Sequence, residues 1–415
     1  MSAPGDEPVD VAAPVPADAP VDAAAPAPAD EGHRADGLGR RPAGGGRGGG
    51  PETGPLSLAD LERFAAKKLG PGALAYYSGA ACDEVTLADN LAAFRRWRVR
   101  PRAMVDVTSR DPSVTVLGRR WPAPVMVAPL ALHRLADPEG EVAVARAAVA
   151  RGLTMSLSTV GSATIEEVAA ACGTGPRWFQ LYPLADRGKT RALLDRAVAS
   201  GYEAIVFTVD CPILGRRERD RRDGFVLPPG VGYPNLASDG DTYARDELAT
   251  SYTWADLEWV ASAAQLPVVA KGVLDPADAT LAFEHGASGI VVSNHGGRQL
   301  DLTIAALDAL PDVVAAVNGR GAVLFDSGIR RGTDVLIALA LGARAVMLGR
   351  PVLWALAWNG EAGVGWAFDQ LLAEFDLALA LAGIPRAADL STRILVRAQT
   401  TCLPDDDSAL PKSYP

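Results

Sequence analysis

The stretch PVVAKGVLDPADATLAFEHGASGIVVSNH, residues 267–295, contains one complete strand–helix–strand repeat. Short apolar runs stand at its two ends, at Pro267–Val273 and Gly289–His295, and a segment with helical start and stop signals lies between them. Parallel strands need such a crossover, because the chain must return to the opposite end of the sheet before the next strand begins. The stretch therefore predicts a parallel sheet covered by helices.

The same pattern recurs along the chain. Six further runs, again separated by helical segments, are Ala123–Ala131, Leu153–Thr159, Arg177–Pro183, Ala204–Asp210, Ala322–Gly328 and Ala345–Pro351. Eight strand–helix units are the number at which a parallel sheet closes, so we predict an α/β fold, the (β/α)8 TIM barrel. A helix that begins at Ser57 and stops at Gly70-Pro71 precedes the first strand, which predicts an N-terminal helical extension.

Composition excludes several classes of protein. The chain has 415 residues, is 48% hydrophobic and carries a formal net charge of −10, which disfavours a binder of nucleic acid or of anionic membranes. It has no apolar stretch of about 18 residues free of charges and helix breakers, and the first ~30 residues do not resemble a signal peptide. The four cysteines form no CxxC pair, so we expect neither a metal site nor a disulfide framework. These features favour a cytoplasmic enzyme that acts on small molecules.

Four segments differ in character. Residues 1–54 are rich in Ala, Pro and Gly and are expected to be a disordered tail, because they cannot bury enough apolar surface to offset their ordering entropy. Residues 55–400 are expected to form the barrel domain, and residues 401–415 a C-terminal tail. Within the barrel, the connection over residues 211–254 is much longer than the others, which is typical of a mobile active-site loop.

The most specific string is SNHGGRQLD, residues 293–301, directly after a predicted strand. A neutral imidazole at a strand end, next to glycines that allow a ligand to approach, is well placed to act as a base, so His295 is the first catalytic candidate. Arg298 can hold a carboxylate through two parallel hydrogen bonds. The alternative for an isolated string of this kind is an ordinary tight turn in which His295 caps the next helix.

Two other strand ends carry charged residues. Asp210 ends the run FTVD and can accept a hydrogen bond from a histidine ring, although alone it is more typical of a helix cap. Lys271 ends a buried strand, where desolvation is costly unless an anion lies nearby. Its possible roles are a Schiff base, a positive charge beside an electron-rich cofactor ring, or an internal ion pair.

The last two strands end in glycine-rich, basic strings, DSGIRRG at residues 326–332 and LGRP at 348–351. In TIM barrels the loops after strands seven and eight often bind phosphate through backbone N–H groups and a cation. Gln180, Thr208 and Lys271 stand at other strand ends, where they can contact a flat heteroaromatic ring. The sequence thus predicts a cofactor with a phosphate tail lying across the mouth of the barrel.

Taken together, the strings SNHGGRQLD, WFQLY, AKGV, DSGIRRGTDV and LGRP, and FTVD followed by LGRRERD, resemble the FMN-dependent α-hydroxy acid oxidase and dehydrogenase family. The resemblance runs from about Leu56 to Leu395. It implies FMN as the cofactor, oxidation of an (S)-2-hydroxy acid to the 2-oxo acid, and a homotetramer or homo-octamer.

The resemblance also implies a role for each matching residue. His295 would be the base, with Asp210 as its partner and Tyr182 beside the substrate hydroxyl. The substrate carboxylate would be held by Tyr76, Arg298 and Arg217. The flavin ring would contact Ser158, Gln180, Thr208, Lys271, Ser293 and the backbone of Ala131. The ribityl chain and phosphate would contact Asp326, Gly328, Arg330, Gly349 and Arg350.

One position departs from the plant glycolate oxidase branch of this family. Val160, in STVGS, stands where that branch has a tryptophan that narrows the pocket, and the long loop lacks an apolar membrane insert. Both features favour a soluble oxidase that uses O2, produces H2O2 and accepts a bulky or aromatic, mandelate-like substrate. The alternatives are an L-lactate oxidase or dehydrogenase with a quinone or other acceptor, an FMN barrel isomerase of the isopentenyl diphosphate type, a Schiff-base aldolase and a non-catalytic binding protein.

Overall fold

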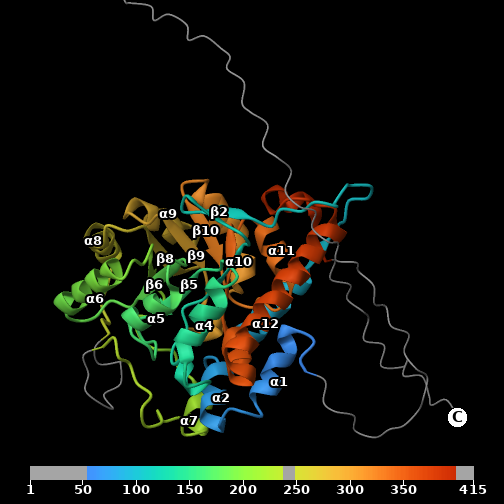
Figure 1. The fold of residues 1–415 in the computed structure, drawn as a ribbon. Helices are drawn as coiled ribbons and strands as arrows, with labels where there is room; N and C mark the ends of the chain where they lie inside the picture. The colour runs from blue at the N-terminus through green and yellow to red at the C-terminus, as the bar shows by residue number, and fades with distance from the viewer. Residues whose placement is uncertain (1–53, 237–247, 399–415) are drawn as a thin grey trace, which may run out of the picture. The chain divides into compact units, whose positions relative to one another are not determined.

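The structure is a computed structural model that describes residues 54–236 and 248–398 (Figure 1). The expected tails, residues 1–54 and 401–415, lie outside the described residues except for Gly54. Residues 237–247, in the middle of the expected mobile loop, also lie outside them. The barrel and its N-terminal extension fall within one compact unit that begins at Gly54.

Within the described residues, eight parallel strands form the barrel. They are β4 (Val125–Val127), β5 (Met155–Ser158), β6 (Arg177–Leu181), β7 (Ile205–Thr208), β8 (Val268–Val273), β9 (Gly289–Val292), β10 (Ala322–Phe325) and β11 (Ala345–Leu348). Their order in the sheet follows the sequence from β5 to β11, and β4 pairs with β11. Parallel bridges from Met126 to Thr154 and from Leu130 to Leu157 join β4 to β5. The sheet therefore closes, and the barrel prediction is confirmed.

Helices alternate with the strands and surround the sheet (Figure 1). They are α4 (Gly140–Val149), α5 (Ile165–Cys172), α6 (Arg187–Ala199), α8 (Trp254–Ala264), α9 (Pro276–Glu284), α10 (Ala306–Val317), α11 (Gly332–Ala340) and α12 (Arg350–Ala382). Local sequence sets several of their starts. Thr164 forms a reciprocal capping box with Glu167, and Asp275 caps α9 ahead of a proline in its first turn.

The N-terminal extension consists of η1 (Leu58–Asp60), α1 (Leu61–Ala65), α2 (Pro71–Ser78), α3 (Val85–Ala92) and η2 (Ala93–Arg96). The expectation that one helix stops at Gly70-Pro71 is wrong in detail. The first helix ends at Ala65, and Pro71 instead begins α2, because its fixed φ suits the first helical turn. The extension is anchored to the barrel, since α1 packs against α12 and Tyr77 on α2 donates a hydrogen bond to the carbonyl of Leu132 (2.7 Å).

Short elements complete the described part of the chain. β1 (Trp97–Val99) pairs with β12 (Leu395–Arg397), and β2 (Val114–Val116) with β3 (Arg119–Trp121). The 3-10 turns are η3 (His133–Leu135), η5 (His295–Gly297), η6 (Ala387–Asp389) and η7 (Thr392–Ile394), and α7 (Glu218–Arg222) lies in the long loop after β7. Figure 1 shows the label of β2 at one end of the barrel and those of α2 and α7 at the opposite end.

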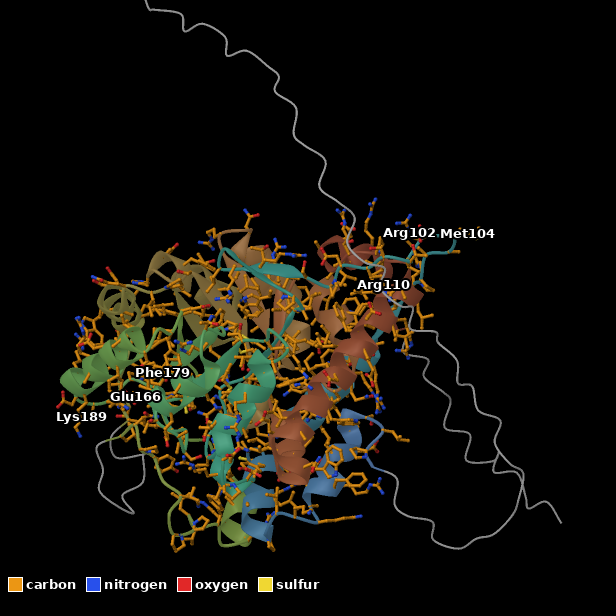
Figure 2. All side chains as sticks on the ribbon, viewed as in Figure 1. Arg102, Met104, Arg110, Glu166, Phe179 and Lys189 are labelled. Carbon is orange, nitrogen blue, oxygen red and sulfur yellow. The ribbon has the colours of Figure 1, made fainter. Side chains whose placement is uncertain are left out.

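The core has an inner and an outer part, because successive strand residues point to opposite faces. Trp178 points into the barrel, where it meets Trp121 of the β2–β3 hairpin edge-on at 5.5 Å between ring centres. Phe179, its neighbour on β6, belongs to the layer between the strands and the helices and meets Tyr202 at 6.0 Å. Phe179 is fully buried, whereas Lys189 of α6 is exposed and lies at the edge of the view in Figure 2. Because side chains fill the barrel interior, a ligand can enter only at a rim.

In the part of the chain that the structure describes, no helix is both long enough and apolar enough to cross a membrane.

Candidate active site

A cavity of about 670 Å³ lies at the C-terminal rim of the barrel. The residues that line it include fourteen predicted ones: Tyr76, Ala131, Ser158, Val160, Tyr182, Arg217, Lys271, His295, Arg298, Asp326, Gly328, Arg330, Gly349 and Arg350. The other four predicted residues lie behind the wall. Asp210 is hydrogen-bonded to His295, and Ser293 is hydrogen-bonded to Lys271. Gln180 accepts a hydrogen bond from Ser158 at 2.7 Å and donates one to Thr208 at 2.9 Å, so these three residues form a hydrogen-bonded row. The structure thus brings the whole predicted set together.

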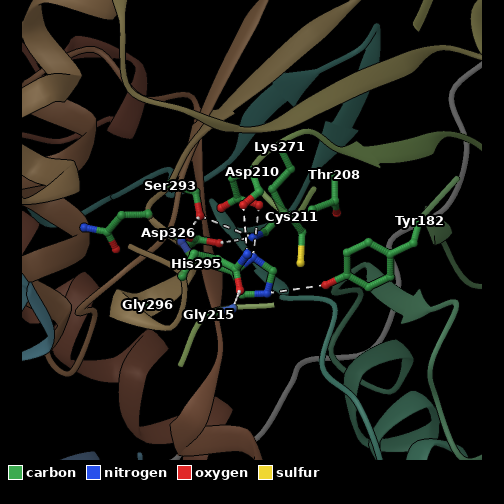
Figure 3. Close-up of polar contacts among 12 residues, drawn as sticks. Tyr182, Thr208, Asp210, Cys211, Gly215, Lys271, Ser293, His295, Gly296 and Asp326 are labelled. Carbon is green, nitrogen blue, oxygen red and sulfur yellow. Dashed lines mark hydrogen bonds and ion pairs between the residues drawn. The ribbon is translucent and has the colours of Figure 1, made fainter. Parts of the chain in front are cut away.

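His295 and Asp210 form the central pair of this site. Nδ1 of His295 lies 3.1 Å from Oδ1 of Asp210, and Nε2 lies 3.4 Å from the hydroxyl oxygen of Tyr182 (Figure 3). With Asp210 accepting a hydrogen bond from the protonated Nδ1, Nε2 carries the lone pair that faces the cavity. This arrangement suits a general base that is oriented and stabilised by a carboxylate.

Electrostatics keep this pair in the right charge state. Burial lowers the pKa of His295 below its ordinary value, an effect that Asp210 only partly opposes and Lys271 reinforces. Burial acts to raise the pKa of Asp210, but His295 and Lys271 more than offset it, so that pKa is lowered. At neutral pH the pair is therefore a neutral imidazole beside a carboxylate, which is the state that a base requires.

Tyr182 is held as a neutral phenol. Burial, reinforced by the nearby Cys211 and Asp210, raises its pKa well above the ordinary value of 10.0. Its hydroxyl group therefore keeps its proton and can donate a hydrogen bond to an oxygen atom in the cavity.

Lys271 makes an ion pair with Asp326, with 3.2 Å between Nζ and Oδ2, and donates to Oγ of Ser293 at 3.2 Å. Burial acts to lower the pKa of Lys271, but Asp326 and Asp210 more than compensate, so that pKa is raised. A lysine that stays protonated is a poor nucleophile. The geometry thus favours a fixed positive charge over a Schiff base. The ion pair with Asp326 helps to keep Lys271 protonated.

Arg298 and Arg217 are two neighbouring arginines that line the cavity. Arg298 donates to the carbonyls of Tyr76 and Gly79, both at 2.8 Å, and its guanidinium lies 5.2 Å from the centre of the Tyr76 ring. Burial is the main cause that lowers the pKa of Arg298 to about 10, and the positive charge of the neighbouring Arg217 is the second. Nε of Arg217 is buried without a hydrogen-bond partner in the described residues. Together these cations fit a carboxylate ligand.

Arg330 and Arg350 also line the cavity, and Arg350 lies beside Arg298, because both donate to the carbonyl of Gly79. Arg350 donates to the carbonyls of Tyr77, Gly79 and Gly296, and Arg330 lies 5.0 Å from the Trp354 ring. Burial lowers the pKa of Arg330 to about 10 and that of Arg350 well below its ordinary value. Within the described residues neither Arg330 nor Arg350 forms an ion pair with a carboxylate. Both are therefore desolvated cations on the cavity wall that lack an anionic partner.

These observations fit FMN. Its phosphate would supply the anion that Arg330 and Arg350 lack, and Gly328, with a φ of 103°, lets the backbone of that loop turn beside it. Lys271 and Ser158, on the cavity wall, offer polar groups for a flavin ring, and Gln180 and Thr208 continue the hydrogen-bonded row behind Ser158.

Sequence reasoning missed several residues that line the cavity. Leu214, Phe225, Val226, Tyr233 and Leu248 come from the long loop after β7. Phe225 stacks on Tyr76, with ring centres 4.7 Å apart and an angle of 15° between the planes. The length of the loop was the only available signal, because nothing in its local sequence shows which of its side chains turn inward.

The chain is similar in sequence and in structure to several known proteins. A sequence profile described as FMN-dependent dehydrogenase matches residues 65–397. An L-lactate oxidase from Nostoc sp. is 48% identical over 357 residues, covering 82% of this chain and 98% of that protein. A glycolate oxidase from Spinacia oleracea is 44% identical over 347 residues, covering 81% and 94%. A mandelate oxidase crystal structure superposes with a TM-score of 0.78 at 44% identity, covering 83% of this chain and 98% of that one. The profile spans every strand of the barrel.

Proposed function

Because the chain belongs to the FMN-dependent dehydrogenase family and oxidises (S)-2-hydroxy acids with FMN, we propose that its preferred substrate has a bulky, aromatic side chain. The observation that carries this proposal is Val160, a small side chain in the wall of a cavity of about 670 Å³. Leu214, Val226 and Leu248 add apolar surface to the same cavity. Solved structures of mandelate oxidase at 44–45% identity support the same substrate class.

We propose the following division of roles. Arg298 and Arg217, with the Tyr76 hydroxyl group, hold the substrate carboxylate, which places the hydroxyl carbon near His295. Nε2 of His295 takes a proton from the substrate, and Asp210 stabilises the imidazolium that forms. Tyr182 donates a hydrogen bond to the substrate hydroxyl oxygen. FMN, when bound, would accept the two electrons together with the second hydrogen of the substrate, and we propose that O2 then takes up the two electrons and both protons to give H2O2.

FMN binding gives a first prediction. Arg330→Met should weaken FMN binding by roughly 10- to 100-fold, because a buried charge-assisted contact to phosphate is lost. The dissociation constant is measured by recovery of flavin fluorescence after dilution. Arg320→Met is the matched control, since Arg320 also lies over an aromatic ring, Phe283 at 5.4 Å, but does not line the cavity. Equal FMN affinity in the wild type and Arg330→Met would show that Arg330 does not bind the phosphate.

The substrate class is tested by mixing the FMN-loaded enzyme anaerobically with a panel of 2-hydroxy acids and following the loss of flavin absorbance. We expect (S)-mandelate and (S)-3-phenyllactate to reduce the flavin with a higher kcat/KM than L-lactate, and glycolate to be the slowest. Admission of air should then restore the absorbance rapidly. Slow recovery in air with fast recovery by a quinone would instead identify a dehydrogenase.

L-lactate is the second candidate substrate, because the relative at 48% identity is named an L-lactate oxidase. The same panel separates the two candidates. A kcat/KM for L-lactate above that for every aromatic acid would replace the aromatic proposal with this one.

A further inference from the structure

The backbone at His295 has an unusual conformation. His295, Gly296 and Gly297 have φ values of 57°, 65° and 77°, so three consecutive residues lie in the left-handed region. Glycine adopts this region freely, but a residue with a side chain does so only when surrounding contacts hold it there. Ser327, which also lines the cavity, has a φ of 82° and is another residue with a side chain in this region. Two of the residues that line the cavity therefore have this strained backbone conformation.

A hydroxyl group links them. Oγ of Ser327 accepts a hydrogen bond from the backbone N–H of Gly296 at 3.2 Å and donates its own proton to Oδ1 of Asp326 at 2.8 Å. The other carboxylate oxygen of Asp326 lies 3.2 Å from Nζ of Lys271. Ser327 thus connects the histidine loop to the buried ion pair.

The connection continues into a closed ring. Lys271 donates to Oγ of Ser293, which also accepts the backbone N–H of His295 at 3.0 Å (Figure 3). The ring runs from Lys271 through Asp326, Ser327 and the Gly296 peptide to His295, and returns through Ser293. The backbone N–H groups of His295 and Gly296 are therefore each fixed by a serine hydroxyl group.

We propose that Ser327 is a positioning residue for the base. Its hydroxyl group holds the left-handed peptide that aims the His295 ring at Asp210 and at the substrate, and it ties that peptide to the charge of Lys271. Removal of the hydroxyl leaves the Gly296 N–H without its partner and Asp326 with one donor fewer, so the ring opens. This inference rests on the proposed role of His295 as the base.

The test is a double-mutant cycle on the FMN-loaded enzyme. Ser327→Ala should lower the rate constant of flavin reduction by roughly two- to tenfold, the range for loss of one hydrogen bond. In the His295→Gln background the same substitution should change the rate by less than about 1.5-fold, because the group on which it acts is absent. An equal loss in both backgrounds overturns the proposal. Failure of His295→Gln itself to slow reduction would instead refute the base role, so the two failures are distinguishable.

Two further variants separate positioning from folding. Ser327→Gly also removes the hydroxyl group but adopts a positive φ without strain, so it should melt at a higher temperature than Ser327→Ala and reduce its flavin equally slowly. If Ser327→Gly reduced its flavin faster than Ser327→Ala, in the same order as the melting temperatures, the proposal would be overturned. Ser156→Ala is the matched control, since Oγ of Ser156 is buried without a partner among the described residues. It should keep the wild-type rate.

Binding measurements complete the test. The dissociation constants of FMN and of the 2-oxo acid product should stay within about twofold of wild type in Ser327→Ala, because the hydroxyl group acts on the base and not on either ligand. A parallel loss of FMN affinity would reassign Ser327 to cofactor binding.

Discussion

His295→Gln should slow reduction of the flavin by the best substrate about 10²- to 10⁴-fold while FMN remains bound, the usual loss when a positioned base is removed. Glutamine keeps much of the side-chain volume and can still bond to Asp210, but it cannot take up a proton. The rate is measured by anaerobic stopped-flow absorbance, and bound FMN is measured by the absorbance ratio of the purified protein.

His285→Gln is the matched control. His285 stacks on Trp254, with 6.3 Å between ring centres, and does not line the cavity. It should reduce its flavin at the wild-type rate. If His295→Gln and His285→Gln were equally fast, the base would have to be sought elsewhere on the rim.

The pH dependence of the wild type follows from the same group. In the proposed role His295 acts when it is neutral, and burial lowers its pKa below the ordinary value of 6.5. The kcat/KM for flavin reduction should therefore be constant at neutral pH and fall only as the pH drops through that lowered pKa. This acidic limb should disappear from the residual activity of His295→Gln. A limb centred above pH 6.5 would contradict the buried, neutral imidazole.

The barrel could be predicted because its signals are local. Each strand is a short apolar run, and helix starts such as the capping box of Thr164 and Glu167 lie within four residues of one another. Since parallel strands point their carboxyl ends to one rim, the strand order alone predicts that His295, Asp210 and Lys271 converge. The structure places them together as that argument requires.

Contacts between distant segments could not be predicted in this way. Asp301 accepts hydrogen bonds from the backbone N–H groups of Val85 and Thr86 at the start of α3, more than 200 residues away in the sequence. Likewise, Phe225 reaches Tyr76 only because the long loop folds back over α2. No periodicity or local cap encodes such pairs. They decide which loop residues enter the cavity. The positions of the proposed base and its partners could therefore be predicted from the sequence, but the loop residues of the cavity wall could not.

Val160 is the wall position with the largest expected effect on specificity. Each buried methylene group contributes up to about 0.8 kcal/mol, so an aromatic side chain in a pocket of sufficient width should gain roughly 10- to 1,000-fold in kcat/KM over glycolate. Val160→Trp adds an indole to the cavity wall and removes that space. We therefore expect the variant to lose at least about tenfold with (S)-mandelate, to change little with glycolate, and to prefer the smaller acid.

Val160→Ala is the matched control, because it alters the same position in the opposite direction. If side-chain volume at residue 160 sets the limit, Val160→Ala should keep the aromatic preference while Val160→Trp reverses it, measured as kcat/KM on the same panel. FMN content should be equal in both variants, because the side chain of residue 160 is not one of the proposed flavin contacts. An aromatic preference that survived in Val160→Trp would mean that the substrate side chain extends toward Phe225 and the long loop, and specificity would then depend on that loop and not on the strand end.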